Sequence, residues 1–361
     1  MTVQRKQKTE ASDYSCEGMV ETKSNKRVHS AAALKTAEKN GADLLDLILH
    51  KDNLNAAWKK VKDNKGAAGI DGMGVDEMLP YLRQHKGEFL RSIQEGHYKP
   101  KPVRRVEIPK PDGGLRLLGV PTVIDRMLQQ AVVQVLEPIF ERTFSDSSYG
   151  FRPNRSAHQA IKRAKDYYDE GYTQVVDIDL EKYFDTVNHD LLLDMLHEQI
   201  SDKRVLRLIR AFLKSGVMVN GLVSESIKGT PQGGNLSPLL SNIYLTRFDR
   251  MLEERGHRFV RYADDCNIYV KSKRASQRVM DSCKQYLEGK LKLKVNKSKS
   301  RTASPLRSKF LGFSLYKMRS KTGIRPHEKS LRRFKARLRE LTSRRQARSI
   351  EMILLRLRRF T

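Results

Sequence analysis

The stretch Arg261-Tyr-Ala-Asp-Asp-Cys-Asn-Ile-Tyr-Val270 places two adjacent aspartates, Asp264 and Asp265, between two short apolar runs. The runs 259–262 and 266–270 have the length and the aromatic or β-branched content of strands. We therefore expect a hairpin that presents both carboxylates at its tip. An Asp-Asp pair also occurs as an ordinary polar turn, so the rest of the chain must decide between a turn and a site.

A second pair of carboxylates lies on another predicted strand. Residues 174–180 alternate apolar and polar side chains, which places Asp177 and Asp179 together on one face. Carboxylate oxygens from separate elements suit Mg²⁺, and two such ions about 4 Å apart can promote an in-line phosphoryl transfer. The sequence predicts a Mg²⁺ site formed by Asp264, Asp265 and Asp179, with Asp177 as the competing ligand.

Composition indicates a polyanionic partner. The 361 residues include 70 Lys plus Arg against 42 Asp plus Glu, a formal net charge of +28. Such a surplus favours nucleic acid, with an anionic membrane as the rival interpretation. No run of about 18 apolar residues and no signal peptide occurs, so we expect no membrane span and no secretion. Cys16, Cys266 and Cys283 form no Cys-x-x-Cys pair, which excludes a zinc finger and fits a cytoplasmic protein.

Local patterns predict the remaining elements. Residues 1–42 have few large apolar side chains and are expected to be a disordered basic leader. A β-hairpin is predicted over 103–120, around a Pro-Asp-Gly-Gly turn. One predicted helix begins at Thr122 and ends at Pro138, and a second begins at Ser156. Further helices are predicted over 190–199, 203–214 and 239–252. The segment 229–234 is expected to be a loop, 310–313 a strand, and the basic tail 329–361 an amphipathic helix.

Five motifs carry a resemblance to a known family. They are "VRRVEIPKPDGG" at 103–114, "SYGFRPNRSAHQA" at 148–160, "DIDLEKYFDTVNHD" at 177–190, "GTPQGGNLSPLLSNIYL" at 229–245 and "RYADDCNIYV" at 261–270. In order and spacing they resemble the reverse transcriptases encoded by group II introns, also called maturases, over about 43–345. The resemblance implies an α+β right-hand polymerase with fingers, an antiparallel palm sheet and a partial helical thumb. It implies these parts: an N-terminal helical extension at 43–100, fingers at 101–173, palm with finger insertions at 174–318, and the start of the thumb or maturase domain at 319–361.

The resemblance also implies the metal ligands. Asp179, Asp264 and Asp265 would hold two Mg²⁺ ions, for which Mn²⁺ can substitute. The family has a bulky residue five positions after its first ligand. Counting from Asp179 this residue is Phe184, whereas counting from Asp177 gives Lys182, so the resemblance favours Asp179.

The same resemblance implies the substrate-binding residues. Phe184 resembles the steric gate that excludes a ribose 2′-hydroxyl, Lys110 and Arg116 resemble residues that grip the triphosphate, and Gln232 resembles a residue that contacts the nucleotide and template. His189 is assigned no chemistry beyond a role in helix capping. The residues expected to bind nucleic acid are Arg104, Arg105, Lys292, Lys294, Lys297, Lys299, Phe310, Leu311 and Gly312.

The implied activity is RNA-directed DNA synthesis from dNTPs. The expected partners are an RNA template, a DNA or RNA primer and a group II intron RNA, with a role in splicing and retrohoming; the oligomeric state is not indicated. The chain stops just after the expected first thumb helix, which predicts a shortened clamp on the duplex. Two other functions stay open: an intron-binding splicing factor that has lost catalysis, and an RNA-dependent RNA polymerase.

Overall fold

The computed structural model describes residues 43–109, 113–219, 222–224, 228–230, 233–319, 321–343, 346 and 349–360. The predicted leader at 1–42 and two predicted nucleotide-binding residues, Lys110 and Gln232, lie outside these ranges. Among the helices that the structure describes, none is long and apolar enough to cross a membrane.

Four antiparallel strands form the sheet that carries the aspartates, in the order β6-β7-β3-β8. Their bounds are β6 Arg258–Tyr262, β7 Asp265–Val270, β3 Gln174–Ile178 and β8 Arg301–Ala303. The strands predicted at 174–180, 259–262 and 266–270 are confirmed. The three residues of β8 are too few to show alternation, and no predicted element corresponds to them.

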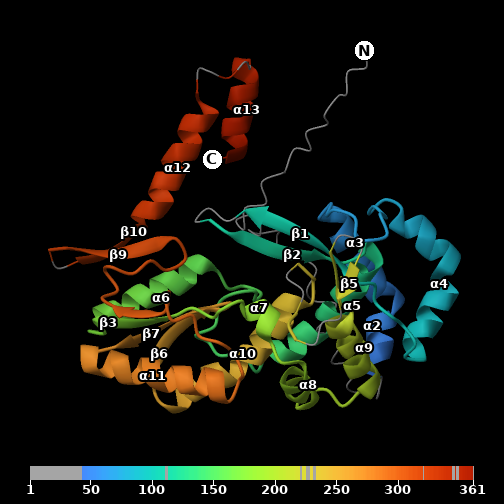
Figure 1. Cartoon of the computed structure of the whole chain (residues 1–361), viewed down its shortest axis with the longest axis horizontal. Helices are drawn as coiled ribbons and strands as arrows, with labels where there is room; N and C mark the ends of the chain where they lie inside the picture. Colours follow the sequence, from blue (N-terminus) through green and yellow to red (C-terminus); the bar gives the residue numbers. More distant parts are fainter. Residues whose placement is uncertain are drawn as a thin grey trace. The chain divides into compact units, whose positions relative to one another are not determined.

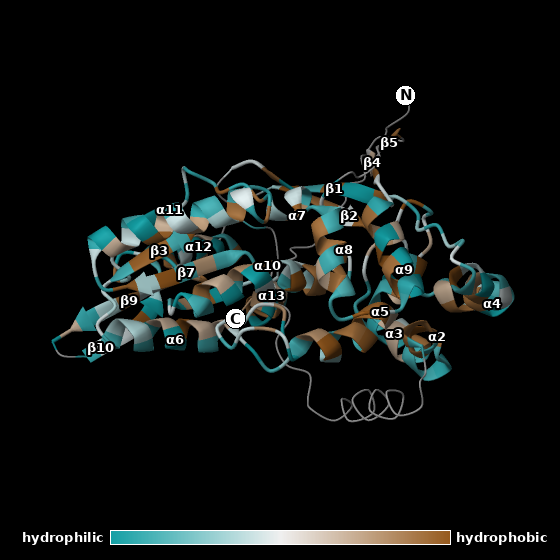
Figure 2. Cartoon of the chain, turned by 90° about the horizontal axis from the view of Figure 1, so that it is seen from below, coloured by the Kyte–Doolittle hydropathy of each residue, from teal (hydrophilic) through white to brown (hydrophobic). Residues whose placement is uncertain are grey.

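Helices cover both faces of this sheet (Figures 1 and 2). Helix α6 (Ala157–Asp169) packs against β6 on one face, whereas α11 (Lys273–Gly289) lies along β3, β7 and β8 on the other. The helix predicted to begin at Ser156 is confirmed, and the structure adds that Ser156 caps α6 through a complete capping box with Gln159. Helix α10 (Ser237–Glu254), which is buried along most of its length, contacts β6 and confirms the helix predicted at 239–252.

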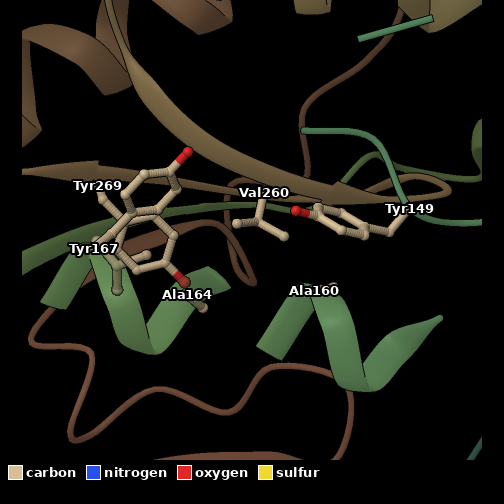
Figure 3. Close-up of a cluster of buried hydrophobic side chains, with 7 residues drawn as sticks. Tyr149, Ala160, Ala164, Tyr167, Val260 and Tyr269 are labelled. Atoms are coloured by element: carbon tan, nitrogen blue, oxygen red, sulfur yellow. The ribbon is translucent and has the colours of Figure 1, made fainter. Parts of the chain in front are cut away.

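Small residues let α6 approach the sheet closely. Ala160 and Ala164 face the side chain of Val260, and the rings of Tyr167 and Tyr269 lie together with centroids 5.5 Å apart (Figure 3). These side chains are all buried and form one apolar cluster. The cluster fixes the sheet face on which Asp177 and Asp179 are also carried.

A second sheet contains the predicted hairpin. Strands β1 (Val103–Pro109) and β2 (Leu115–Val120) are antiparallel, which confirms that prediction. Strand β4 (Val217–Val219) runs parallel to β1 and pairs with β5 (Leu222–Ser224). The parallel contact brings together segments more than 100 residues apart, which periodicity does not reveal.

Helix α5 (Val123–Glu141) is the most buried helix beside this second sheet. Thr122 caps it by accepting a hydrogen bond from the Asp125 N–H at 3.1 Å. The predicted end at Pro138 is wrong, because the helix continues to Glu141. A proline in the last turn removes only one hydrogen bond, and the buried Phe140 continues the apolar face.

The other helices surround α5 and the loops near the aspartates. Helices α2 (Leu44–Leu49) and α3 (Lys51–Asp63) pack on α5, and α4 (Met78–Gln94) follows them. Helices α8 (His189–His197) and α9 (Lys203–Lys214) confirm the helices predicted at 190–199 and 203–214. The single turn α7 (Tyr183–Thr186) lies between Asp179 and α8.

The C-terminal part differs from two predictions. Residues 310–313 form a tight turn, not a strand, because Leu311 and Gly312 have φ values of 49° and 87°. The strand begins only at Phe313, where β9 (Phe313–Met318) pairs with β10 (Lys321–Pro326). The tail contains two helices, α12 (Glu328–Leu341) and α13 (Ile350–Phe360), where the sequence predicts one.

Candidate functional site

Asp264 and Asp265 lie at the turn between β6 and β7, as the sequence predicts. Tyr262 pairs with Asp265, so Ala263 and Asp264 form a two-residue loop. Ala263 has a φ of 58°, in the left-handed region that residues with a side chain rarely adopt. Backbone strain of this kind concentrates at functional sites. The strained loop fixes the two carboxylates at one end of the sheet.

Gly150 supports this loop from a distant part of the chain. A Cβ atom at Gly150 would lie 2.2 Å from the backbone nitrogen of Ala263, so only glycine fits. The Gly150 carbonyl also accepts a hydrogen bond from Asn242 Nδ2 at 2.8 Å. The segment that contains Gly150 therefore serves to position the loop.

A fully buried arginine holds the loop from inside. Arg261 donates from Nε and Nη2 to the two carboxylate oxygens of Asp249, at 2.7 and 2.5 Å, and both residues have 0% exposure. Its Nη1 donates to the Ala263 carbonyl at 2.9 Å and to Asn242 Oδ1 at 3.0 Å. Burial alone would lower the pKa of Arg261, but the charge of Asp249 raises it above its usual value. Arg261 therefore ties the strained loop to α10.

Arg261, Asp249 and Gly150 were not predicted from the sequence to be part of the site. A signal for Arg261 was present, because a charged residue inside a predicted buried strand requires a partner. The identity of that partner depends on how α10 packs against β6, which the sequence pattern leaves open.

Asp179 follows directly after β3 and its backbone is fixed on both sides. Its N–H donates to Ser300 Oγ at 3.0 Å, and its carbonyl accepts from the Asn296 N–H at 2.9 Å. Extending the β3–β7 register by one residue places Asp179 opposite Asp265. Two segments that are widely separated in the sequence thus bring their carboxylates to the same end of the sheet.

Asp177 has a different environment from Asp179. It lies within β3, opposite Asn267 on one side and Arg301 on the other. The Asp177 carboxylate is 3.7 Å from Arg301 Nε. Asp177 is thus two residues further along the strand from the β6–β7 loop than Asp179, and the Arg301 guanidinium lies beside it.

The carboxylates raise one another's pKa values. Burial raises the pKa of Asp264, the charge of Asp179 raises it further, and the charge of Arg116 opposes both. Asp265 reaches solvent, but partial burial together with the charges of Asp264, Asp177 and Asp179 raises its pKa to about 7. Burial, with a contribution from Asp179, raises the pKa of Asp177 to about 6. Negative charge accumulates here, so a bound cation would favour ionisation of the whole set.

The donor set suits a divalent metal ion. Hard carboxylate oxygens are the ligands that Mg²⁺ prefers, and the repulsion between Asp179, Asp264 and Asp265 is what such an ion would relieve. Within the described ranges, no group of three acidic, histidine or cysteine residues lies close enough together to hold a metal ion as the side chains stand. The residue types fit a divalent ion, but the three carboxylates would have to move closer together to bind one.

Phe184 lies on α7, five residues after Asp179, and is half-buried. The neighbouring Tyr183 is buried and donates its hydroxyl to the Ser241 carbonyl at 3.0 Å. The two rings meet edge to face with centroids 5.2 Å apart. Tyr183 anchors the turn in the core, so Phe184 remains available at its surface.

The loop predicted to carry Gln232 begins beside Phe184. The Thr230 N–H donates to the Phe184 carbonyl at 2.6 Å, and the Gly229 N–H donates to the Val187 carbonyl at 2.8 Å. His189 Nε2 lies 2.7 Å from the Gly229 carbonyl. His189 therefore holds this loop, while Asn188 caps α8 by accepting from the Leu191 N–H.

Glutamines of α5 hold the other end of that loop. Asn235 Nδ2 donates to Gln130 Oε1 at 3.1 Å, and the Leu236 N–H points to Gln129 Oε1 at 3.5 Å. A Cβ atom at Gly233 would lie 2.7 Å from the Gly119 carbonyl of β2. These contacts join the loop to α5 and the hairpin, and they were not predicted from the sequence.

Of the two predicted triphosphate-binding residues, the structure describes Arg116. It is exposed on β2 opposite Ile108, and its charge partly offsets the rise in the pKa of Asp264. Arg116 therefore lies within electrostatic range of the aspartates.

The predicted nucleic-acid residues have varied surroundings. Arg104 donates twice to the Ala68 carbonyl, at 3.1 and 2.8 Å, so its guanidinium is used inside the protein, and Arg105 is half-buried. Lys294 forms an ion pair with Glu181 at 2.9 Å. The exposed lysines of this segment are Lys292, Lys294, Lys297 and Lys299.

The turn at 310–313 links the sheet to α12. Phe310 and Leu311 pack against the apolar cluster, and the Gly312 carbonyl accepts from Ser330 Oγ at 2.9 Å. The charge of Lys309, just before the turn, partly offsets the rise in the pKa of Asp265. The turn thus lies on the sheet face that carries Asp265.

Comparison with known proteins agrees with this geometry. A family profile described as reverse transcriptase (RNA-dependent DNA polymerase) matches residues 108–315. Protein YkfC of Escherichia coli is 36% identical over 321 residues, covering 78% of this chain and 84% of YkfC. The group II intron-encoded protein LtrA of Lactococcus lactis is 31% identical over 365 residues, covering 81% of this chain and 61% of LtrA. A truncated apo telomerase structure from Candida tropicalis has a TM-score of 0.48 at 16% identity, covering 62% of this chain and 55% of that one. So distant a likeness adds nothing to the assignment.

Proposed function

Because this chain belongs to the reverse transcriptase family of RNA-dependent DNA polymerases, we propose that it extends a primer 3′-hydroxyl with deoxynucleotides on an RNA template. The observation that carries this proposal is that β3 and the β6–β7 loop bring Asp179, Asp264 and Asp265 to one end of the sheet. Two Mg²⁺ ions bound there would supply the charge stabilisation of an in-line phosphoryl transfer. The protein's part is to hold the three carboxylates and to position the nucleotide.

We assign the parts of the chain to a right-hand polymerase. The antiparallel sheet with α10 and α11 supports a palm over 174–318, and the β1–β2 hairpin with α5 supports fingers over 101–173. Helices α2 to α4 form the N-terminal extension at 43–100, and 319–361 begins the thumb.

The incoming nucleotide is held between the hairpin and α7. Arg116 carries a positive charge near Asp264, and Lys110 at the hairpin turn would bind the same triphosphate. Phe184 forms the wall beside the sugar, and the Thr230 N–H donates to the Phe184 carbonyl. Gln232, two residues later in the sequence, would contact the nucleotide and the template. A ribose 2′-hydroxyl would collide with the ring, so dNTPs are selected over rNTPs.

Replacing Phe184 with valine should raise the use of rNTPs relative to dNTPs by about tenfold to a hundredfold, because removing a steric wall changes discrimination on this scale. The measurement is the ratio of kcat/KM for rNTP and dNTP incorporation on one RNA template. Phe184→Tyr keeps the ring and should leave the ratio unchanged. A Phe184→Val ratio equal to that of the wild type would contradict the gate.

Basic residues supply contacts to the nucleic-acid backbone. Lys292, Lys294, Lys297 and Lys299 are exposed and Arg105 is half-buried, and these five residues are assigned to backbone binding. Arg104 joins that set only if its bond to Ala68 opens. The relation to LtrA supports a group II intron RNA as partner, with a role in splicing and mobility. The chain spans 61% of LtrA's length, so these activities are part of the proposal.

Primer extension tests the proposed function directly. The purified chain should incorporate dNTPs on a primed RNA template with Mg²⁺, and EDTA should abolish incorporation until Mg²⁺ is added in excess. Incorporation of rNTPs in preference to dNTPs would instead identify an RNA-dependent RNA polymerase. Support of intron splicing without any cDNA would identify a splicing factor that lacks catalysis.

A further inference from the structure

A surface groove of about 500 Å³ opens at the end of the sheet away from the aspartates. It lies where β6 begins, β7 ends and α11 passes beside them. Asp265 begins β7 and Lys271 follows its end, so the two are six residue steps apart along an extended strand, about 20 Å. The groove is therefore distinct from the proposed catalytic site.

The groove is lined by cations that form no ion pair with the acidic residues that the structure describes. Arg258, Lys271 and Arg278 are all exposed and line it, and none of the described lining residues is acidic. None of the ion pairs within the described part of the chain involves these three residues. Burial, together with the charge of Arg255, lowers the pKa of His257, which also lines the groove. Within the described ranges, the positive charge of Arg258, Lys271 and Arg278 is therefore not offset by a direct carboxylate contact.

An aromatic ring borders the same groove. Tyr172 is held against the buried cluster and its ring lies 6.2 Å from that of Tyr167. Lys271 Nζ lies over the Tyr172 ring, 5.5 Å from its centroid. Sites for single-stranded nucleic acid combine cations along the backbone with an aromatic surface for bases.

We propose that this basic groove binds the sugar–phosphate backbone of single-stranded RNA outside the template–primer site. Its volume lies in the range of sites that hold one small ligand, which suits one nucleotide of a strand crossing the groove. Arginines and lysine without carboxylate partners favour phosphates, and RNA is a polyanion that this family uses as template. An acidic peptide is the competing ligand, and the experiment below distinguishes it from RNA.

Lysine footprinting of the intact wild-type chain tests occupancy without any variant. A single-stranded RNA of about 16 nucleotides, added without primer or dNTPs, should protect Lys271 from acylation at least threefold, as measured by mass spectrometry. Exposed Lys60 on α3 serves as the internal control and should stay reactive. Equal reactivity of Lys271 with and without saturating RNA would overturn the proposal. So would equal protection by polyglutamate of the same charge.

Salt dependence provides a second, energetic readout. In the variant Arg258→Gln, Lys271→Gln and Arg278→Gln, the slope of log K against log salt should become shallower by about 2, since three phosphate contacts contribute about 0.7 each. The matched control replaces three exposed lysines on other helices, Lys60, Lys86 and Lys214, with glutamine and removes the same charge. An equal change of slope in both variants would show that only net charge matters and would overturn the site.

Discussion

Replacing Asp264 with asparagine should lower the rate of primer extension by about a thousandfold. Asparagine keeps the shape of the side chain but removes the charge that a divalent ion requires. Asp264 is the half-buried member of the loop, and burial and the charge of Asp179 raise its pKa, so the two carboxylates are close enough to interact. Single-turnover extension on an RNA template measures the effect. Equal incorporation by variant and wild type would refute the proposed site.

The same assay separates Asp179 from Asp177. Asp179→Asn should lose activity to a similar extent as Asp264→Asn, because the strand register places Asp179 opposite Asp265. Asp177→Asn should retain activity within about tenfold of the wild type, since Asp177 is two residues further from the β6–β7 loop than Asp179 and has Arg301 as its neighbour. Thermal melting checks that both variants fold. A loss confined to Asp177→Asn would reverse the ligand assignment.

Local patterns were sufficient to predict the elements that carry the aspartates. The alternation of 174–180 and the two apolar runs around Asp264 and Asp265 specify strands, because a strand's period of two is written directly into its sequence. The helix start predicted at Ser156 was equally local, since the residue that completes its cap in the structure, Gln159, is three residues away. These features place three of the proposed site residues without any tertiary information.

Tertiary packing decided the features that the sequence did not reveal. Gly150 contacts Ala263 across more than 100 residues, and nothing in its own segment indicates which backbone it must approach. Pro138 does not end α5, because a local rule about proline is outweighed by the burial of Phe140. The turn at 310–313 replaces a predicted strand because Gly312 permits a positive φ, a choice that apolarity alone does not signal.

The buried pair Arg261–Asp249 behind the β6–β7 loop should control both stability and activity. Arg261→Met leaves the carboxylate of Asp249 fully buried without its partner, which costs about 3–5 kcal/mol. That loss is a large fraction of the roughly 5–15 kcal/mol by which domains are stable. It should appear as a large decrease in the urea midpoint and in Tm. A variant that unfolds within about 1 kcal/mol of the wild type would contradict this account.

A double variant separates the pair's contribution to stability from its role in the loop. Arg261→Met with Asp249→Leu removes both charges, so it should recover most of the stability that either single change loses. It cannot restore the hydrogen bond from Arg261 to the Ala263 carbonyl, and Ala263 holds a left-handed conformation that then lacks this support. The folded double variant should therefore extend primers at least about tenfold more slowly than the wild type. Wild-type rates in a stable double variant would show that Arg261 stabilises the fold without positioning Asp264 and Asp265.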